Sequence, residues 1–169
     1  LTLRNRIIRA GCFEGMCENG NCTDLLIEHH RAVAAGGTAM TTVSYVSVSE
    51  ESRAYGHEMW MRKEILPELR RLTDAVHKEG GAASVQLGHC GYFASKADTG
   101  FVPMGASRKF NLFRLSFPKV MIEADIKKVI EQFASAALLA REAGLDAVEI
   151  HSGHGYLLSQ FLSPFTNHR

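Results

Sequence analysis

Residues 146–164 are Asp146-Ala147-Val148-Glu149-Ile150-His151-Ser152-Gly153-His154-Gly155-Tyr156-Leu157-Leu158-Ser159-Gln160-Phe161-Leu162-Ser163-Pro164. The segment 146–151 has the apolar character of a strand, and 157–162 looks like the start of a helix. Side chains alternate between the two faces of a strand, so Val148 and Ile150 share one face. Glu149 and His151 share the other. If the apolar pair packs against helices, we expect Glu149 and His151 to point toward the interior of a barrel.

The rest of the chain alternates strands and helices in the same way. Predicted strands lie at 6–10, 38–44, 82–87 and 146–151, and predicted helices at 23–36, 63–78 and 126–144. The last helix is the best defined, because Ile126, Val129, Ile130 and Phe133 recur at helical spacing. The segment 88–121 has no clear period, and loops this long are usually functional or disordered. We expect this loop to help set substrate choice.

This alternation predicts an α/β fold with a parallel sheet built from right-handed crossovers. Two architectures compete, a doubly wound open sheet and a (β/α)8 TIM barrel. Short strands with candidate site residues after them favour the barrel, whose sites lie on the loops that follow the strands. A full barrel needs about 250 residues. The chain of 169 residues is therefore expected to supply roughly the first four βα units, with the remainder of the barrel absent from it.

Composition excludes several classes of function. The net charge is +1, with 46% apolar and 22% charged residues, values typical of a globular protein. No run approaches the ~20 apolar residues of a membrane span, and near-neutral charge argues against a nucleic-acid partner. The N-terminus lacks the features of a signal peptide. We therefore expect a cytoplasmic protein that binds neither membranes nor nucleic acid.

The cysteines do not have the spacing of a metal site. Cys12, Cys17 and Cys22 recur at five-residue intervals, and Cys90 stands apart. This spacing fits neither a zinc knuckle nor a familiar iron–sulfur motif. Without a secretory signal, free thiols are expected rather than disulfides.

Three proton donors follow the strand at 146–151. His151, His154 and Tyr156 lie within six residues and are flanked by glycines. Two imidazoles can donate hydrogen bonds to one carbonyl oxygen, and a phenol can act as a general acid. The alternatives are histidines that only cap a loop, or a metal site, which needs a third ligand. Glu149 fits a paired interior carboxylate better than a catalyst.

Gln86 is a second candidate, on a neighbouring strand. It shares a face with Ser84, while Val85 and Leu87 share the other face. An inward glutamine must find partners, because an unpaired buried amide costs a few kcal/mol. Its donor and acceptor suit a planar heterocycle with C=O and N–H edges. Bonding to neighbouring backbone is an equally good explanation from the pattern alone.

Several stretches together resemble one family. The string from His151 through His154-Gly155-Tyr156 to Arg169 is similar to a signature of the old yellow enzyme family of FMN-dependent ene reductases. Further stretches resemble the first four strands of that family at matching places; these are 3–8, 36–43, 84–91 and 143–151. The resemblance runs the length of the chain, and its last motif is highly specific.

The resemblance implies a (β/α)8 barrel with FMN at its carboxyl-terminal mouth, of which 1–169 is the N-terminal half. NADH or NADPH would reduce the flavin, and hydride would pass from flavin N5 to an activated alkene. His151 and His154 would bind the carbonyl or nitro oxygen of the substrate, and Tyr156 would give the proton. Gln86 would bind the pyrimidine edge of the flavin.

The same resemblance implies flavin contacts after the first two strands. Backbone near Ala10, Gly11 and Cys12, and near Ser44 and Tyr45, would line the cofactor. The family usually has a proline after the first strand, which is missing here, so either Cys12 or Phe13 takes the flavin-tuning position; Cys12 is preferred. Tyr45 stands where a small residue is common and would narrow the pocket.

Two other features differ from the family pattern. The frequent Gly-Arg after the third strand is Gly91-Tyr92 here, which removes a charge near the site. The loops that hold the FMN phosphate follow strands seven and eight, and neither lies in 1–169. The second half of the barrel would come from the same or another chain, and a homo-oligomer is left open.

Two rival functions remain. One is a metal-dependent TIM-barrel hydrolase with His151 and His154 as ligands, and the other is a non-catalytic barrel fragment. The preferred reading is a flavin-dependent oxidoreductase acting with NAD(P)H on a small-molecule alkene.

Overall fold

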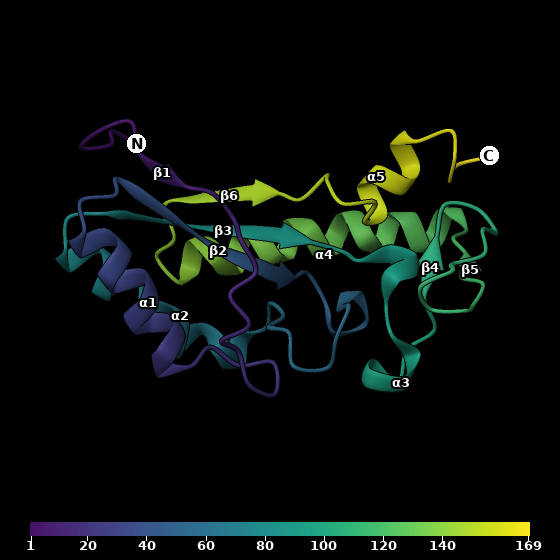
Figure 1. The fold of residues 1–169 in the computed structure, drawn as a ribbon, viewed down its shortest axis with the longest axis horizontal. Coiled ribbons are helices and arrows are strands. Elements are labelled where there is room, and N and C mark those ends of the chain that lie inside the picture. Colours follow the sequence, from purple (N-terminus) through teal and green to yellow (C-terminus); the bar gives the residue numbers. More distant parts are fainter.

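The strands form one parallel sheet. A computed structural model describes residues 1–169, and its four-stranded sheet has the order β1-β2-β3-β6. The strands are β1 (Ile8–Arg9), β2 (Met40–Ser47), β3 (Ala82–Gly88) and β6 (Ala147–Ile150). Each pairs in parallel with the next, so their carboxyl ends meet at one edge (Figure 1).

Helices connect successive strands. They are α1 (Asp24–Ala35), α2 (Leu66–Lys78) and α4 (Glu123–Glu142), and the short α5 (Leu157–Leu162) follows β6. Thr23 caps α1, because its hydroxyl accepts the N–H of Leu26 at 3.2 Å. The Asp125 carboxylate accepts the N–H of Ile122 at 3.0 Å where α4 begins. The predicted strands and helices are therefore confirmed as elements.

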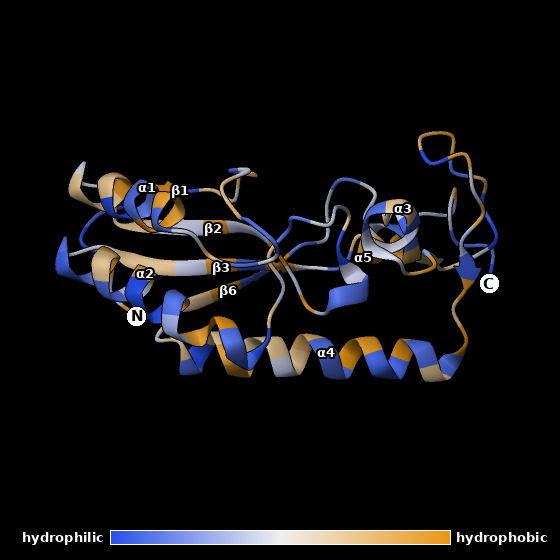
Figure 2. Cartoon of the chain, turned by 90° about the horizontal axis from the view of Figure 1, so that it is seen from below, coloured by the Kyte–Doolittle hydropathy of each residue, from blue (hydrophilic) through white to orange (hydrophobic).

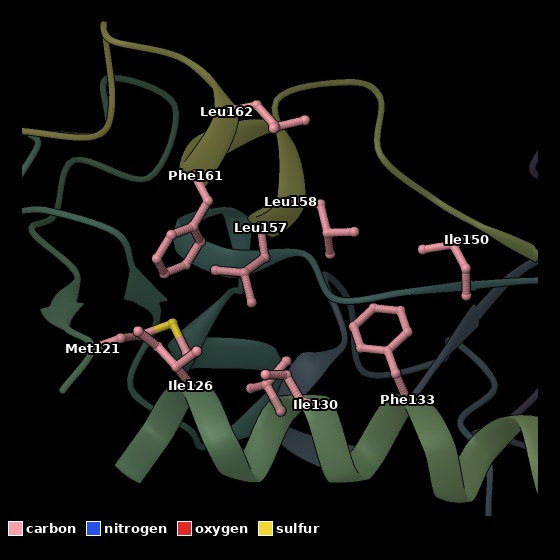
Figure 3. Close-up of a pocket in the computed structure, with 10 residues that line it drawn as sticks. Met121, Ile126, Ile130, Phe133, Ile150, Leu157, Leu158, Phe161 and Leu162 are labelled. Carbon is pink, nitrogen blue, oxygen red and sulfur yellow. The ribbon is translucent and has the colours of Figure 1, made fainter. Parts of the chain in front are cut away.

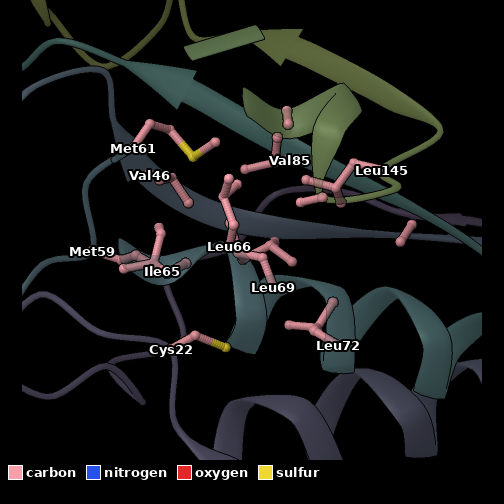
Figure 4. Close-up of a cluster of buried hydrophobic side chains, with 14 of the residues drawn as sticks. Cys22, Val46, Met59, Met61, Ile65, Leu66, Leu69, Leu72, Val85 and Leu145 are labelled. Carbon is pink, nitrogen blue, oxygen red and sulfur yellow. The ribbon is translucent and has the colours of Figure 1, made fainter. Parts of the chain in front are cut away.

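The main core lies between the helices and one face of the sheet (Figure 4). Its buried members come from all three long helices and from β2 and β3; they include Leu26, Leu69, Leu72, Val76, Ala136, Ala140, Val43 and Val85. A doubly wound sheet would have helices on both faces. One shared core therefore favours the barrel arrangement.

The opposite face of the strands is polar. Thr42 Oγ1 and Ser84 Oγ lie 2.6 Å apart, and Ser44 Oγ donates to Gln86 Oε1 at 3.1 Å. The predicted alternation in β3 is confirmed, because Val85 and Leu87 belong to the helix-facing core while Ser84 and Gln86 do not. One face of this sheet thus packs against the helices, and the other carries hydrogen-bonding side chains.

Some predicted boundaries were wrong. β2 continues to Ser47 rather than ending at 44, because Ser47 pairs with Gly88 across a register shift between Val43 and Val46. β1 is only Ile8–Arg9. These edges depend on pairing partners, which the local sequence does not show.

The segment 88–121 is partly ordered by short elements. A 3₁₀ turn lies at Gly91–Phe93, and the short helix α3 (Lys96–Thr99) follows it. Farther along, β4 (Met104–Gly105) and β5 (Lys119–Val120) form a small two-stranded sheet. Further 3₁₀ turns lie at Glu50–Ser52 and Lys63–Ile65. Figure 2 shows α4 extending below both the sheet and this loop region, with hydrophobic and hydrophilic residues alternating along it. None of the helices combines the length and apolar character that crossing a membrane requires.

Candidate active site

A cavity of about 410 Å³ lies at the carboxyl ends of the strands. Its lining comes from the loop after β1, from β2 and β3 and the segment between them, and from the loop after β6; the residues are Gly11, Cys12, Phe13, Ser44, Tyr45, Tyr55, Glu58, Gln86, His151, His154 and Tyr156. The structure therefore brings the sequence-predicted residues together, except one. Ala10 is exposed and does not line the cavity, because it precedes Gly11, the residue of this loop that packs against Gln86.

Gln86 is held by side chains from both neighbouring strands. Its Oε1 accepts from Ser44 Oγ at 3.1 Å, and its Nε2 donates to Glu149 Oε1. These contacts fix the plane of the amide and leave one N–H of its NH2 group without a partner in the chain. Glu149 is thus paired, as predicted, although its side chain is exposed.

Gly11 lets the first loop approach Gln86 closely. A Cβ at this position would lie 2.7 Å from Gln86 Nε2 and 3.2 Å from Ser44 Cβ. Any side chain would therefore displace the amide. The same loop supplies Cys12, which is exposed, and Phe13, so both candidates for the flavin-tuning position line the cavity.

A buried carboxylate ties this loop to β2. Glu14 Oε1 lies 2.8 Å from the guanidinium of Arg9, and Glu14 Oε2 accepts the N–H of Ser44 at 3.3 Å. His30 approaches Glu14 at 3.5 Å and bonds Thr41 Oγ1 at 2.7 Å. The position of Ser44, and through it of Gln86, is therefore set by contacts from β1 and α1.

The two histidines bond to each other. His154 Nδ1 and His151 Nε2 lie 3.2 Å apart, and burial, with a smaller effect of His154, lowers the pKa of His151. In a neutral pair one ring donates to the other, which leaves one free N–H. Both rings can donate to a single ligand oxygen only after this contact opens.

Tyr156 completes an aromatic group. Its ring lies 5.2 Å from that of His151 and 5.4 Å from that of Tyr45, centroid to centroid. Burial, followed by the charge of Glu58, raises the pKa of Tyr156 to about 12. The phenol therefore keeps its proton across the neutral range and is available as a donor.

Tyr45 forms a fixed wall. Its hydroxyl donates to the Ser52 carbonyl at 3.0 Å. A Cβ on Gly88 would lie 2.2 Å from the Tyr45 ring, so glycine is what allows the ring to lie there. The expectation that Tyr45 narrows the pocket fits this placement.

Gln160 of α5 braces the loops that carry the site. It is 1% exposed, and its Nε2 donates to the carbonyls of Gly155 at 2.7 Å and Cys90 at 3.3 Å. Its Oε1 accepts the N–H of Tyr92 at 3.3 Å. The loops after β3 and β6 are thereby joined beside Tyr156.

Sequence reasoning missed Tyr55 and Glu58. Both come from the segment between β2 and α2, which shows no periodicity. The single signal is a glutamate beside the apolar run Met59-Trp60-Met61. Glu58 is 3% exposed, and burial raises its pKa to about 7.

Arg114 brings a positive charge to the same wall. Its guanidinium carbon lies 4.9 Å from the centroid of the Tyr55 ring, and its Nη2 donates to the Ala54 carbonyl at 3.3 Å. It comes from the long segment after β3. A positive charge therefore lies behind the Tyr55 side of the cavity, although Arg114 itself does not line it.

Other parts of the molecule lack this chemistry. A cavity of about 480 Å³ between α4 and α5 is lined entirely by hydrophobic side chains, including Ile130, Phe133, Ile150 and Phe161 (Figure 3). Ile150 thus faces α4 and α5, as the strand alternation predicts. No group of three or more His, Cys, Asp or Glu side chains within residues 1–169 is arranged to hold a metal ion, so this part of the protein offers His151 and His154 no third ligand. All four cysteines are free.

Sequence comparison identifies related proteins along the whole chain. A family model described as the NADH:flavin oxidoreductase / NADH oxidase family matches residues 1–169. The chain is 43% identical over 169 residues to a 4,4'-dithiodibutanoate disulfide reductase of Rhodococcus erythropolis, covering all of this chain and 42% of that protein. It is 36% identical over 172 residues to an NADPH dehydrogenase of Listeria monocytogenes serotype 4a, again covering all of this chain and 50% of the relative. The chain thus spans about half the length of these curated relatives.

Comparison with solved structures identifies proteins that share the architecture of this chain. A 2-naphthoyl-CoA reductase in complex with 2-naphthoyl-CoA matches with a TM-score of 0.92 and 27% identity, over 99% of this chain and 28% of that one. An old yellow enzyme homologue from Zymomonas mobilis matches with a TM-score of 0.90 and 23% identity, over 100% of this chain and 50% of that one. The second likeness concerns the fold alone. The predicted (β/α)8 barrel class, with this chain as about half of it, is confirmed.

Proposed function

Because the chain belongs to the NADH:flavin oxidoreductase / NADH oxidase family, we propose that it is part of an FMN-dependent oxidoreductase that uses NAD(P)H to reduce activated C=C bonds. In this proposal 1–169 is the N-terminal half of the barrel domain of a longer protein. The relatives of about twice this length support that division.

One observation carries the proposal. A single cavity at the strand ends collects a fixed amide, two imidazoles and a phenol. The amide suits a planar heterocycle, and the other three groups suit a substrate that gains negative charge and then a proton. The apolar cavity between α4 and α5 has none of these groups.

The cavity residues also fit FMN. The close approach of Gly11 to Gln86 leaves backbone and amide groups, rather than side-chain bulk, facing the cavity. Gln86 and Ser44 would hold the pyrimidine edge, and Gly11, Cys12 and Tyr45 would line the ring. Bound FMN would take hydride from NAD(P)H and pass it to the substrate carbon.

The remaining residues would handle the substrate. His151 and His154 would donate hydrogen bonds to its carbonyl or nitro oxygen and stabilise the charge that develops there. Tyr156 would give a proton to the second carbon of the double bond. All three side chains line the same cavity, which supports this division of roles.

The first experiment uses the full-length protein that contains this chain. We expect it to carry FMN, to lose its yellow colour when NADPH or NADH is added without oxygen, and to regain it when an enone is added. A protein without flavin, or one whose colour is unaffected by either nucleotide, would contradict the proposal. If a small disulfide restores the colour and no activated alkene does, the substrate would be a disulfide, the class named for the Rhodococcus relative.

A second experiment tests Tyr156. Replacement of Tyr156 by Phe removes the proton and keeps the ring, so reoxidation by an alkene should slow about 100-fold, as expected for the loss of a general acid. Reduction by NAD(P)H should stay near its normal rate. Stopped-flow absorbance of the flavin measures both steps, and equal slowing of the two would argue against a proton donor.

A further inference from the structure

Glu58 is a cavity carboxyl group for which the proposed function has no role. It is 3% exposed and lines the same cavity as Tyr156. Its Oε2 accepts the N–H groups of Ala54 at 2.6 Å and Tyr55 at 3.2 Å. No hydrogen bond from the chain reaches its Oε1. One oxygen is therefore fixed by backbone and the other is free to exchange a proton at the cavity.

Glu58 and Tyr156 belong to the same part of the wall. Tyr156 packs against a small cluster made by Ala54, Cys90 and Ala94, and Ala54 is the residue whose N–H holds Glu58. The backbone that fixes the carboxyl group thus also supports the phenol. Both side chains line one cavity of about 410 Å³, which has room for water that would carry a proton between them.

Both charged and titratable groups surround this carboxyl group. Those that interact with it electrostatically are Arg53, Arg114, Cys17, Cys90, Tyr45 and Tyr156. Arg53 is engaged with Glu50 and the Gly56 carbonyl, and Arg114 with the Tyr55 ring. The imidazoles of His151 and His154 share the cavity. None of these cations forms an ion pair with Glu58 that would hold it permanently ionised.

We propose that Glu58 supplies the proton that restores Tyr156 after each turnover. This inference rests on the proposed function and adds a positioning residue to it. Bound, reduced FMN would supply a hydride, with its two electrons, to one alkene carbon. The Tyr156 O–H bond breaks as its proton forms a C–H bond at the other carbon, which leaves a tyrosinate. The Glu58 carboxylic acid then gives its proton to the tyrosinate, and the carboxylate takes a proton from water.

The acidities of the two groups favour this direction. Burial raises the pKa of Glu58 to about 7, and burial together with the Glu58 charge raises that of Tyr156 to about 12. A proton therefore moves downhill from the carboxylic acid to the tyrosinate. Below neutral pH the carboxyl group is protonated and ready to give it.

The test replaces Glu58 by Gln in the full-length, flavin-loaded enzyme. The amide oxygen can still accept from Ala54 and Tyr55, but the group no longer exchanges a proton. We expect alkene reduction at about pH 6 to slow about tenfold, a modest part of a general-acid contribution, with NAD(P)H reduction of the flavin unchanged. The normal enzyme should slow as pH rises through about 7, and the variant should lack that limb.

Controls separate charge from structure. Glu64→Gln removes an exposed carboxyl group close to Glu58 in the sequence and should leave the pH profile intact. Glu58→Asp should restore a titrating limb. Because Glu58 acts through Tyr156, adding Glu58→Gln to Tyr156→Phe should cause no further slowing.

Infrared difference spectra give a readout that does not depend on activity. A carboxylic-acid C=O band that disappears between about pH 6 and about pH 9 should be present in the enzyme and in Glu64→Gln, and absent in Glu58→Gln. Additive slowing in the double variant, or an unchanged pH profile in an active Glu58→Gln enzyme, would overturn the inference. A protein that neither binds nor reduces flavin would instead overturn the proposed function.

Discussion

A carboxyl group that is removed from water affects stability as well as chemistry, and Glu58 is such a group. Its folded-state pKa, about 7, lies above the value of 4.5 for a free side chain. The folded state therefore holds this proton more tightly than the unfolded state does. The stabilisation is fully present below pH 4.5 and is lost as pH rises through 7.

This residue gives a prediction for stability. Gln has no such titration, so Glu58→Gln should gain stability relative to the normal protein as pH rises. Between about pH 5 and about pH 8 the relative gain in the free energy of unfolding should be about 2 kcal/mol. Urea unfolding of both proteins at the two pH values measures it. A constant difference would show that Glu58 titrates like an exposed carboxyl group.

The histidine pair gives a second prediction at this scale. Replacing His151 and His154 together by Ala removes both donors, so phenolic ligands should bind about tenfold or more weakly, the equivalent of one or two lost hydrogen bonds. Flavin reduction by NAD(P)H should be largely preserved. Spectral titration of the flavin with a phenol measures the affinity, and an unchanged affinity would count against their role as oxyanion-binding groups.

At the level of single residues, the site was predictable where a motif or a strand pattern carries it. His151, His154 and Tyr156 follow β6, and Gln86 lies within β3; all four were found in this way. Glu58 was not, because its burial results from backbone contacts to Ala54 and Tyr55, which have no sequence signature.

The elements that form the cavity meet through close backbone packing. The loop after β1 touches the side chains of β2 and β3 at Gly11, where a Cβ would lie 2.7 Å from Gln86. The strand register and this loop are therefore coupled. A change in the loop is transmitted to the amide two strands away.

Gly11→Ala tests that coupling. The added methyl group would push the Gln86 amide out of plane, so the full-length protein should bind FMN about tenfold more weakly, a loss of the size expected for one disturbed hydrogen bond to the ring. Gly36→Ala, whose Cβ would meet only ordinary contacts at 3.4 Å, is the matched control. Fluorescence titration with FMN measures both, and equal affinities would remove Gly11 from the cofactor site.

Elements were predictable in kind more than in extent. Local signals set the limits of the helices; Thr23, for example, caps the start of α1. The end of β2 depends on the pairing of Ser47 with Gly88 after a register shift. Because that pairing joins distant residues, no local pattern could place it.

At the scale of the whole molecule, the alternation of strands and helices was enough to predict the barrel. It could not show what covers the apolar surface of α4. Ile130 is 63% exposed although it lines the hydrophobic cavity beside α5. In the proposed full barrel, later elements would pack there.

A charged substitution on the apolar surface of α4 tests whether 1–169 is only half of the barrel domain. In the full-length protein, Ile130→Glu should lower the melting temperature by several degrees, since burying an unpaired charge costs several kcal/mol. Ser135→Glu, on an exposed part of the same helix, should change it little. Thermal unfolding measures both, and equal melting temperatures would mean that Ile130 stays exposed.

The way β2 and β3 divide their side chains has a practical consequence for engineering. In β3, Val85 and Leu87 belong to the helix-facing core and Gln86 between them lines the cavity. In β2 the register shift after Val43 breaks this order, so Tyr45 lines the cavity and Val46 belongs to the core. A mutant library chosen from the cavity-lining residues, rather than from every second position, would vary ligand contacts without disturbing the core that keeps the protein folded. Directed evolution of new substrates can therefore start from a short, predefined set of codons.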